Sequence, residues 1–241
     1  MPDTAFTPTT PTRKRRMALN AAHVARVFRE VPETDDHRPG MTLLTEEDKR
    51  AVARDLVREL GDAPFWIFAY GSLIWNPAFE FAEARRATAH GWKRDFCIHL
   101  DGWRGTPEQP GLMLALSPGG SCVGMAYRMP DDNREERMFR LVEREMGFHE
   151  HRLWLRFLTL RAGGEAFRAL TFYCTPPEAP QRLHLPMAEQ AKRIALACGP
   201  KGANVEYLYN TVSHLEESGI HDSYLWRMQQ LVAAEIDALD A

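Results

Sequence analysis

The sequence predicts an α+β domain with a closed or strongly curved, barrel-like mixed sheet and helices around it. Strand-like segments come first after residue 65, and helical patterns cluster toward the C-terminus, which is typical of this class. No internal repeat and no doubly wound βαβ rhythm is present. The chain has 241 residues, of which 44% are apolar and 26% charged, so it can bury a sizeable core.

Residues 1–44 are predicted to form a flexible N-terminal arm. A Thr/Pro-rich stretch over residues 4–12 is followed by the basic run 13–16. The segment after that run is broken by Asn20 and His23, so it is not the apolar core of a signal peptide. A solvated arm is the simplest interpretation, and contact of the basic run with RNA or lipid head groups is the alternative.

A helix is predicted over residues 45–62. Thr45 is a good N-cap, and an acidic first turn follows it, which favours the positive end of the helix dipole. Gly61 is expected to end the helix.

The strand pattern begins with a continuous apolar run over residues 65–70, which indicates a buried strand ending at Gly71. Two glycine-rich turns are predicted to close hairpins, one at residues 118–120 and one at residues 162–164. The further strand candidates are residues 87–100, 112–116, 121–128, 153–160 and 169–174. The later helix candidates are residues 134–145, 186–197, 204–215 and 223–239.

Charge and cysteine usage exclude several classes of protein. A net charge of −3 gives no general attraction to nucleic acid or to an anionic membrane. No apolar run reaches the ~18 residues of a membrane span. The four cysteines lie far apart without a C-x-x-C motif, which predicts reduced thiols in a cytoplasmic protein.

The turn Tyr70-Gly71-Ser72-Leu73 follows the most buried strand candidate. Glycine lets the backbone turn sharply and expose consecutive N–H groups, which can hold an anion or a carbonyl oxygen. The spacing matches neither a Walker A loop nor G-x-G-x-x-G. On these four residues alone, an ordinary strand-ending turn with Tyr70 in the core explains the pattern better.

Glu145 ends an amphipathic helical pattern. Its position, four residues after Leu141 and three after Val142, places it toward the buried side, whereas Glu143 points elsewhere. Desolvation there would raise its pKa, as a general base requires. The alternative is a surface or capping carboxylate.

Three other segments are less informative. The Gly- and Pro-rich loop 104–111 either frames a site or only connects strands. His149 and His151 lack H-E-x-x-H spacing and a third ligand, so no metal site is predicted. No G-x-S-x-G motif is present, and no cysteine lies in the setting of a catalytic nucleophile.

Taken together, the segments resemble the ChaC-like γ-glutamylcyclotransferase family over about residues 65–235. Any single piece is short, but the ordered set is specific. The matching pieces, in family order, are Phe68 to Pro77, Gly91-Trp92 with Arg94 and Phe96, Arg104 to Pro107, Pro110-Gly111, Gly120 to Arg128, Arg144-Glu145, and Gly199 to Asn204 leading into Glu206-Tyr207-Leu208.

The resemblance implies a catalytic domain over residues 63–241 that needs no cofactor. It implies cleavage of glutathione to 5-oxoproline and Cys-Gly, in which the substrate's own α-amine attacks its γ-carbonyl. Glu145 matches the family's catalytic glutamate. The turn Tyr70-Gly71-Ser72-Leu73 matches its substrate loop, and Tyr207 matches a tyrosine near the site.

The chain departs from the family pattern directly after Glu145. Met146-Gly147-Phe148 stands where the family has a longer Gly-containing stretch ending in Tyr. This leaves open other γ-glutamyl amines or dipeptides as substrates. A catalytically silent binding protein of the same fold is the second alternative, and the sequence does not define the oligomeric state.

Overall fold

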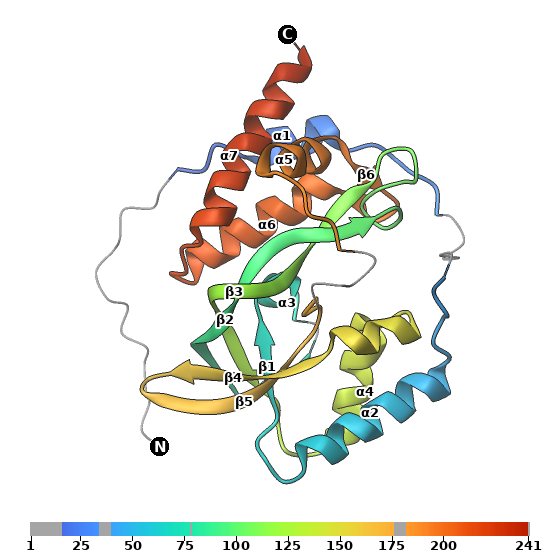
Figure 1. Cartoon of the computed structure of the whole chain (residues 1–241), viewed down its shortest axis with the longest axis vertical. Coiled ribbons are helices and arrows are strands. Elements are labelled where there is room, and N and C mark those ends of the chain that lie inside the picture. Colours follow the sequence, from blue (N-terminus) through green and yellow to red (C-terminus); the bar gives the residue numbers. More distant parts are fainter. Residues whose placement is uncertain (1–15, 34–39, 78, 176–181, 241) are drawn as a thin grey trace.

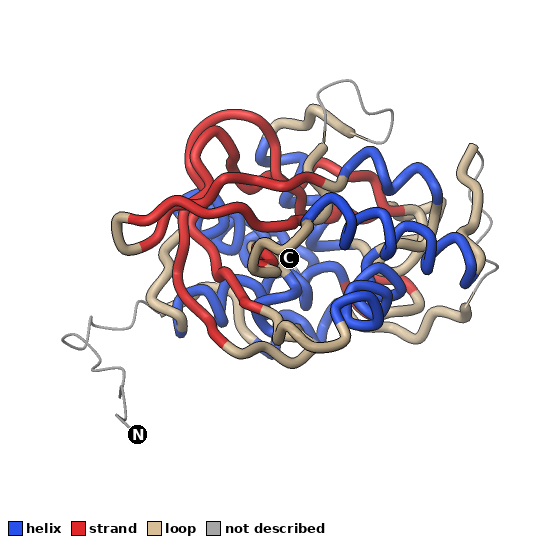
Figure 2. Tube along the Cα trace, turned by 90° about the horizontal axis from the view of Figure 1, so that it is seen from below, coloured by secondary structure: helices blue, strands red, loops and turns tan. Residues whose placement is uncertain are grey.

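The computed structural model describes residues 16–33, 40–77, 79–175 and 182–240. Five strands close into a barrel in the order β1-β3-β2-β4-β5, and a parallel pair between Ile67 and Leu170 joins the two ends. The prediction of a closed mixed sheet with surrounding helices is confirmed. The barrel strands are β1 (Trp66–Ala69), β2 (Glu83–Leu100), β3 (Gly111–Arg128), β4 (Arg156–Ala162) and β5 (Glu165–Thr171). These strands gather on one side of the trace in Figure 2.

The predicted hairpin at residues 118–120 is wrong, because β3 continues through it. Gly119 and Gly120 adopt φ values of 100° and 74°, and Gly91 on the paired strand β2 adopts 83°. The β2–β3 register shifts between His90 and Trp92, at this same level. The glycines therefore bend both long strands together, and the chain reverses at residues 101–110. The second hairpin, at residues 162–164, is confirmed.

The helices lie in two groups on opposite sides of the sheet (Figure 1). On one side α2 (Glu46–Leu60) packs against α4 (Arg134–Glu145), and on the other α5 (Met187–Leu196), α6 (Asn204–Glu217) and α7 (Ser223–Asp237) pack together. These five helices begin and end close to the predicted positions. The shorter elements are α3 (Ser72–Trp75), η1 (His149–Trp154), β6 (Cys198–Gly199), β7 (Gly202–Ala203) and η2 (Ala238–Asp240).

Strand β1 is apolar on both faces because it separates two cores. Trp66 and Phe68 belong to the core beneath α5–α7, whereas Ile67 and Ala69 belong to the core beneath α2 and α4. A strand buried on both faces reads as a continuous apolar run, which is why residues 65–70 do not alternate. The C-terminal end of β1, which leads into Tyr70 and Gly71, is thereby held between the two cores.

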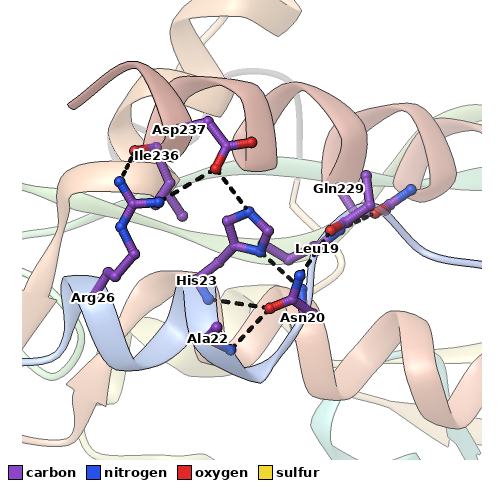
Figure 3. A network of polar contacts seen from close by, with 9 residues as sticks. Leu19, Asn20, Ala22, His23, Arg26, Gln229, Ile236 and Asp237 are labelled. Carbon is purple, nitrogen blue, oxygen red and sulfur yellow. Dashed lines mark hydrogen bonds and ion pairs between the residues drawn. The ribbon is translucent and has the colours of Figure 1, made fainter. Parts of the chain in front are cut away.

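The expectation of a flexible arm is wrong for residues 16–33. Helix α1 (Ala21–Val27) begins with a capping box between Asn20 and His23. Figure 3 shows this segment against α7, where the Leu19 N–H donates to Gln229 Oε1 at 2.8 Å and His23 faces Asp237. Burial of Leu19 on α7 provides an apolar anchor that the Thr/Pro-rich start lacks. Residues 1–15, with most of the basic run, lie outside the described part.

No helix in the described ranges is long and apolar enough to cross a membrane.

Candidate active site

A cavity of about 310 Å³ opens where the end of β1, the C-terminal end of α4 and the start of α6 meet. All six residues singled out from the sequence line it: Tyr70, Gly71, Ser72, Leu73, Glu145 and Tyr207. They come from three segments separated by more than sixty residues each. The fold thus brings together elements that the sequence shows only as separate motifs.

Gly71 is required where the chain turns from β1 into α3. A Cβ at this position would lie 2.8 Å from the Tyr207 Oη, closer than real Cβ contacts. The backbone bends into the short helix α3, with the Ile74 N–H donating to the Gly71 carbonyl at 3.0 Å. Ser72 and Leu73, at the start of α3, line the cavity. The backbone of Ser72 acts to lower the pKa of the Tyr207 hydroxyl and offsets part of the rise caused by burial.

A buried arginine, Arg94, forms a hydrogen bond with the backbone of this turn. The Arg94 side chain is 1% exposed and donates from Nε to the Tyr70 carbonyl at 2.7 Å. Its other nitrogens bind the Val123 carbonyl at 2.7 Å and Asp222 Oδ2 at 2.8 Å. Asp222 also caps α7, so the turn, the barrel and α7 are joined through one guanidinium. The sequence shows Arg94 as part of a motif but contains no signal that it supports the loop.

Glu145 reaches the cavity from the last turn of α4, with its side chain only 10% exposed. Burial raises the pKa of its carboxyl group, and Arg144 Nη1, 3.3 Å from Oε1, offsets part of that rise. The Tyr173 hydroxyl donates to the Glu145 carbonyl at 2.7 Å and fixes the end of the helix. The predicted lean of Glu145 toward the buried side is confirmed.

Two tyrosine hydroxyls border the same space. Burial raises the pKa of both Tyr70 and Tyr207, so both remain protonated donors. Tyr70 donates to the carbonyl oxygens of Phe172 at 3.0 Å and Tyr173 at 3.2 Å, which makes it a structural contact. The Tyr207 hydroxyl donates to no acceptor among the described residues, so its proton is available to a ligand.

The loop 104–111 forms part of the cavity wall and is locked by close backbone packing. A Cβ on Gly105 would lie 2.5 Å from the Gly111 nitrogen, and one on Gly199 would lie 2.5 Å from the Gly105 carbonyl oxygen. Arg104 lines the cavity and binds Glu206 Oε2 at 2.6 Å. Asn204 bridges to the backbone N–H and carbonyl of Leu112, at 2.8 Å and 2.9 Å. Glycine is needed at positions 105 and 199 because these backbone segments pack too closely for a Cβ atom.

A second hollow of about 230 Å³ adjoins the cavity and shares Glu145, Arg144 and Tyr173 with it. We call the first cavity the glutamate-145 lobe and the second the side lobe. The segment 146–148, where the sequence predicts a departure from the family pattern, lines the side lobe. Glu143 also borders it, so Glu143 does not simply face away from the site.

The two histidines after Glu145 lie on the 3₁₀ helix η1 and have different partners. His149 Nε2 is 3.5 Å from Asp48 Oδ2, whereas the His151 ring stacks on Trp154 at a centroid distance of 5.2 Å. Among the described residues, no group of three His, Cys, Asp or Glu side chains could hold a metal ion.

Comparisons with known proteins agree with this arrangement. The family model described as "ChaC-like protein" matches residues 65–235. The glutathione-specific γ-glutamylcyclotransferase of Escherichia coli (strain K12) is 38% identical over 188 residues, which cover 76% of this chain and 80% of that protein. The γ-glutamylcyclotransferase 2-1 of Arabidopsis thaliana is 30% identical over 71% of this chain and 83% of that protein.

A solved structure supports the fold independently. The crystal structure of a yeast γ-glutamyl cyclotransferase specific to glutathione superposes with a TM-score of 0.62 at 21% identity, covering 72% of this chain and 97% of that chain. The match to the family model spans well over half of the chain, and the ordered motifs of the family meet in one cavity. The chain therefore belongs to the ChaC-like protein family.

Proposed function

We propose that the protein is a γ-glutamylcyclotransferase that converts glutathione to 5-oxoproline and Cys-Gly. The observation that carries this proposal is the meeting of a buried carboxylate, Glu145, with the turn Tyr70–Leu73 in one small cavity. The relatives named glutathione-specific γ-glutamylcyclotransferases support the choice of substrate.

The proposed reaction is an intramolecular acyl transfer. The α-amine nitrogen of the glutamyl group attacks its own γ-carbonyl carbon and forms the lactam bond. The bond between that carbon and the cysteine nitrogen then breaks. One proton leaves the attacking amine and one arrives on the leaving nitrogen, so neither water nor a redox partner is consumed. The enzyme has to fold the substrate, move a proton and stabilise an oxyanion.

In this proposal Glu145 accepts the proton from the attacking amine and returns one to the leaving nitrogen. Its raised pKa brings it closer to the neutral working range, where both transfers are feasible. The backbone N–H groups at the start of α3 and the Tyr207 hydroxyl hold the glutamyl end and the developing oxyanion. Arg94 acts as a positioning residue because it reaches the turn only through the Tyr70 carbonyl.

The burial of Glu145 argues against a silent binding protein of the same fold. A desolvated carboxylate opposes folding unless it is fully paired, and among the described residues Arg144 is the only ion-pair partner of Glu145. A scaffold without chemistry would gain stability by replacing it. Substrates with other leaving amines remain the second candidate, because segment 146–148 differs from the family pattern in the side lobe.

We also propose that the protein works in the cytoplasm and binds no nucleic acid. All four cysteines are free and buried, which fits a reducing compartment. The net charge of −3 supports the absence of a nucleic-acid partner.

The proposal is tested by incubating the purified full chain with glutathione and with a panel of γ-glutamyl dipeptides, followed by an assay of 5-oxoproline. Equal amounts of 5-oxoproline and Cys-Gly from glutathione are expected. Release of 5-oxoproline only from other γ-glutamyl compounds would select the alternative substrates. A folded protein that releases none would overturn the enzyme assignment.

A further inference from the structure

The side lobe borders Glu145, and the turn Tyr70–Leu73 lines only the glutamate-145 lobe. Glu145 serves both the attacking and the leaving nitrogen in the proposed reaction. A substrate whose glutamyl group occupies the first lobe therefore extends its leaving amine past Glu145 into the side lobe. This inference rests on the proposed function of the site.

The walls of the side lobe come partly from outside the matched family region. Met41 and Lys49 precede residue 65, where the family match begins, and both line the lobe. Segment 146–148 also lines the lobe. The side lobe therefore includes residues from outside the matched family region, whereas every residue that lines the glutamate-145 lobe lies within it.

Backbone hydrogen bonds join residues 42–44 to the segment after Glu145. The Leu44 N–H donates to the Gly147 carbonyl at 3.0 Å, and the His149 N–H donates to the Thr42 carbonyl at 2.9 Å. The Thr42 N–H in turn donates to Glu150 Oε2 at 3.0 Å. The start of α2, with Lys49 in its first turns, is thereby fixed beside the lobe before any ligand binds, which lowers the entropy cost of binding.

The charged groups around the lobe leave one cation without a partner. The Glu143 carboxylate pairs with Arg140 at 3.1 Å, and Glu145 lies 3.3 Å from Arg144. Among the described residues, the Lys49 side chain has no hydrogen-bond or ion-pair partner, although it lines the lobe and is partly buried. A ligand that carries a carboxylate would supply an ion-pair partner for the Lys49 ammonium group.

We propose that the side lobe is the subsite for the leaving amine and that Lys49 binds the free carboxylate of that amine. The matching ligands are γ-glutamyl peptides whose leaving group ends in a carboxylate, as Cys-Gly does. Apolar walls from Trp103, Met113 and Trp154 accept the rest of the leaving group. Simple γ-glutamyl amines lack the group that Lys49 recognises.

The test compares Lys49→Met with wild type on two substrates, glutathione and its ethyl ester at the glycine carboxyl group. Methionine keeps an unbranched side chain and removes the charge. For glutathione, KM should rise about tenfold in Lys49→Met, with kcat changed by less than about twofold, because the contact is made equally in ground and transition states. For the ester, wild type and Lys49→Met should have the same KM. Lys49→Arg should restore most of the affinity for glutathione.

Lys192→Met is the matched control, because Lys192 is an exposed cation on α5 that lines neither lobe. It removes the same charge and should leave both substrates unaffected. Equal KM values for Lys49→Met and wild type on glutathione would overturn the proposal, as would an equal rise of KM for glutathione and the ester.

An equilibrium measurement separates this proposal from the proposed function. Glutathione and its ethyl ester are titrated calorimetrically into Glu145→Gln and into Glu145→Gln/Lys49→Met, so that no turnover is needed. Weaker binding of glutathione alone in the double variant supports the subsite even if wild type releases no 5-oxoproline. Identical binding of both ligands to both variants contradicts the subsite even if the enzyme is active.

Discussion

The two lobes on either side of Glu145 are built in different ways. The glutamate-145 lobe takes its walls from β1, α3, α4 and α6, all within the region that matches the family. The side lobe takes part of its wall from α2 and the segment before it, which precede that region. The segment directly after Glu145, which pairs with residues 42–44, also lines the side lobe.

In the proposed function, the glutamate-145 lobe carries the chemistry and the side lobe contributes to the choice of substrate. Proton transfer and oxyanion stabilisation demand fixed geometry, and the glutamate-145 lobe has a glycine, a buried arginine and interlocked loops that provide it. Recognition of the leaving group tolerates variation, and the side lobe includes Met41 and Lys49 from outside the matched region. Changes in the first lobe should therefore alter the rate, and changes in the second should alter the affinity for particular substrates.

The largest effect is expected for Glu145→Gln. The amide keeps the shape of the side chain but cannot accept a proton from an amine, so kcat/KM should fall by about 10²–10⁴-fold for every γ-glutamyl substrate. Steady-state kinetics on glutathione and a γ-glutamyl dipeptide measure this loss.

Glu135→Gln is the appropriate control, because Glu135 is exposed on the same helix and lines neither lobe. Glu143 is unsuitable, since it borders the side lobe. A Glu145→Gln protein that is destabilised yet fully active per folded molecule would remove Glu145 from the chemistry.

The second-largest loss of activity is expected for Gly71→Ala. The added Cβ would meet the Tyr207 Oη at 2.8 Å, so the turn or the tyrosine has to shift. A displacement of about 1 Å among reacting groups can cost about 10²-fold in rate, and kcat/KM should fall by that order.

A double variant shows whether this steric contact is the cause. Without the hydroxyl of Tyr207, the nearest atom to the new Cβ would be Leu114 Cδ2 at 3.6 Å, an ordinary contact. Gly71→Ala/Tyr207→Phe should therefore be no slower than Tyr207→Phe alone. Strictly additive losses would show that the clash is not the source of the defect.

The smallest effect is on stability and depends on pH. The pKa of Glu145 is raised in the folded state, so the folded protein binds more protons than the unfolded chain between the two pKa values, and stability falls as pH rises through that window. Glu145→Gln, which has no such charge, should melt at a higher temperature than wild type at pH 7. The difference should vanish below the ordinary glutamate pKa of about 4.3. Thermal melts at both pH values measure it, and a Gln variant that melts lower at pH 7 would contradict the raised pKa.

The fold was predictable wherever periodicity alone decides the structure. Residues 134–145 form a helix with the predicted ends, and the capped start at Thr45 is also confirmed. The bend at Gly119-Gly120 was misjudged because glycines at positive φ serve equally in a hairpin turn and in a bent strand, and only the partner Gly91 distinguishes them. Helix α1 was missed because its stability comes from burial against α7.

The same limit applies to the site. Glu145, the turn Tyr70–Leu73 and Tyr207 were identified through ordered motifs, because those motifs are shared with a family. Lys49 carries no motif, and its place beside the side lobe follows only from the pairing of residues 42–44 with the segment after Glu145. Contacts between segments a hundred residues apart leave no trace in local sequence.

In the proposed reaction the substrate's own amine, and not water, attacks the γ-carbonyl in the glutamate-145 lobe. The direct measurement is turnover of glutathione in H₂¹⁸O, followed by mass spectrometry of the glutamyl-derived product. The lactam oxygen comes from the original γ-carbonyl, so the account predicts 5-oxoproline without ¹⁸O. Glutamate carrying ¹⁸O in its γ-carboxylate would show hydrolysis by water and would contradict the account.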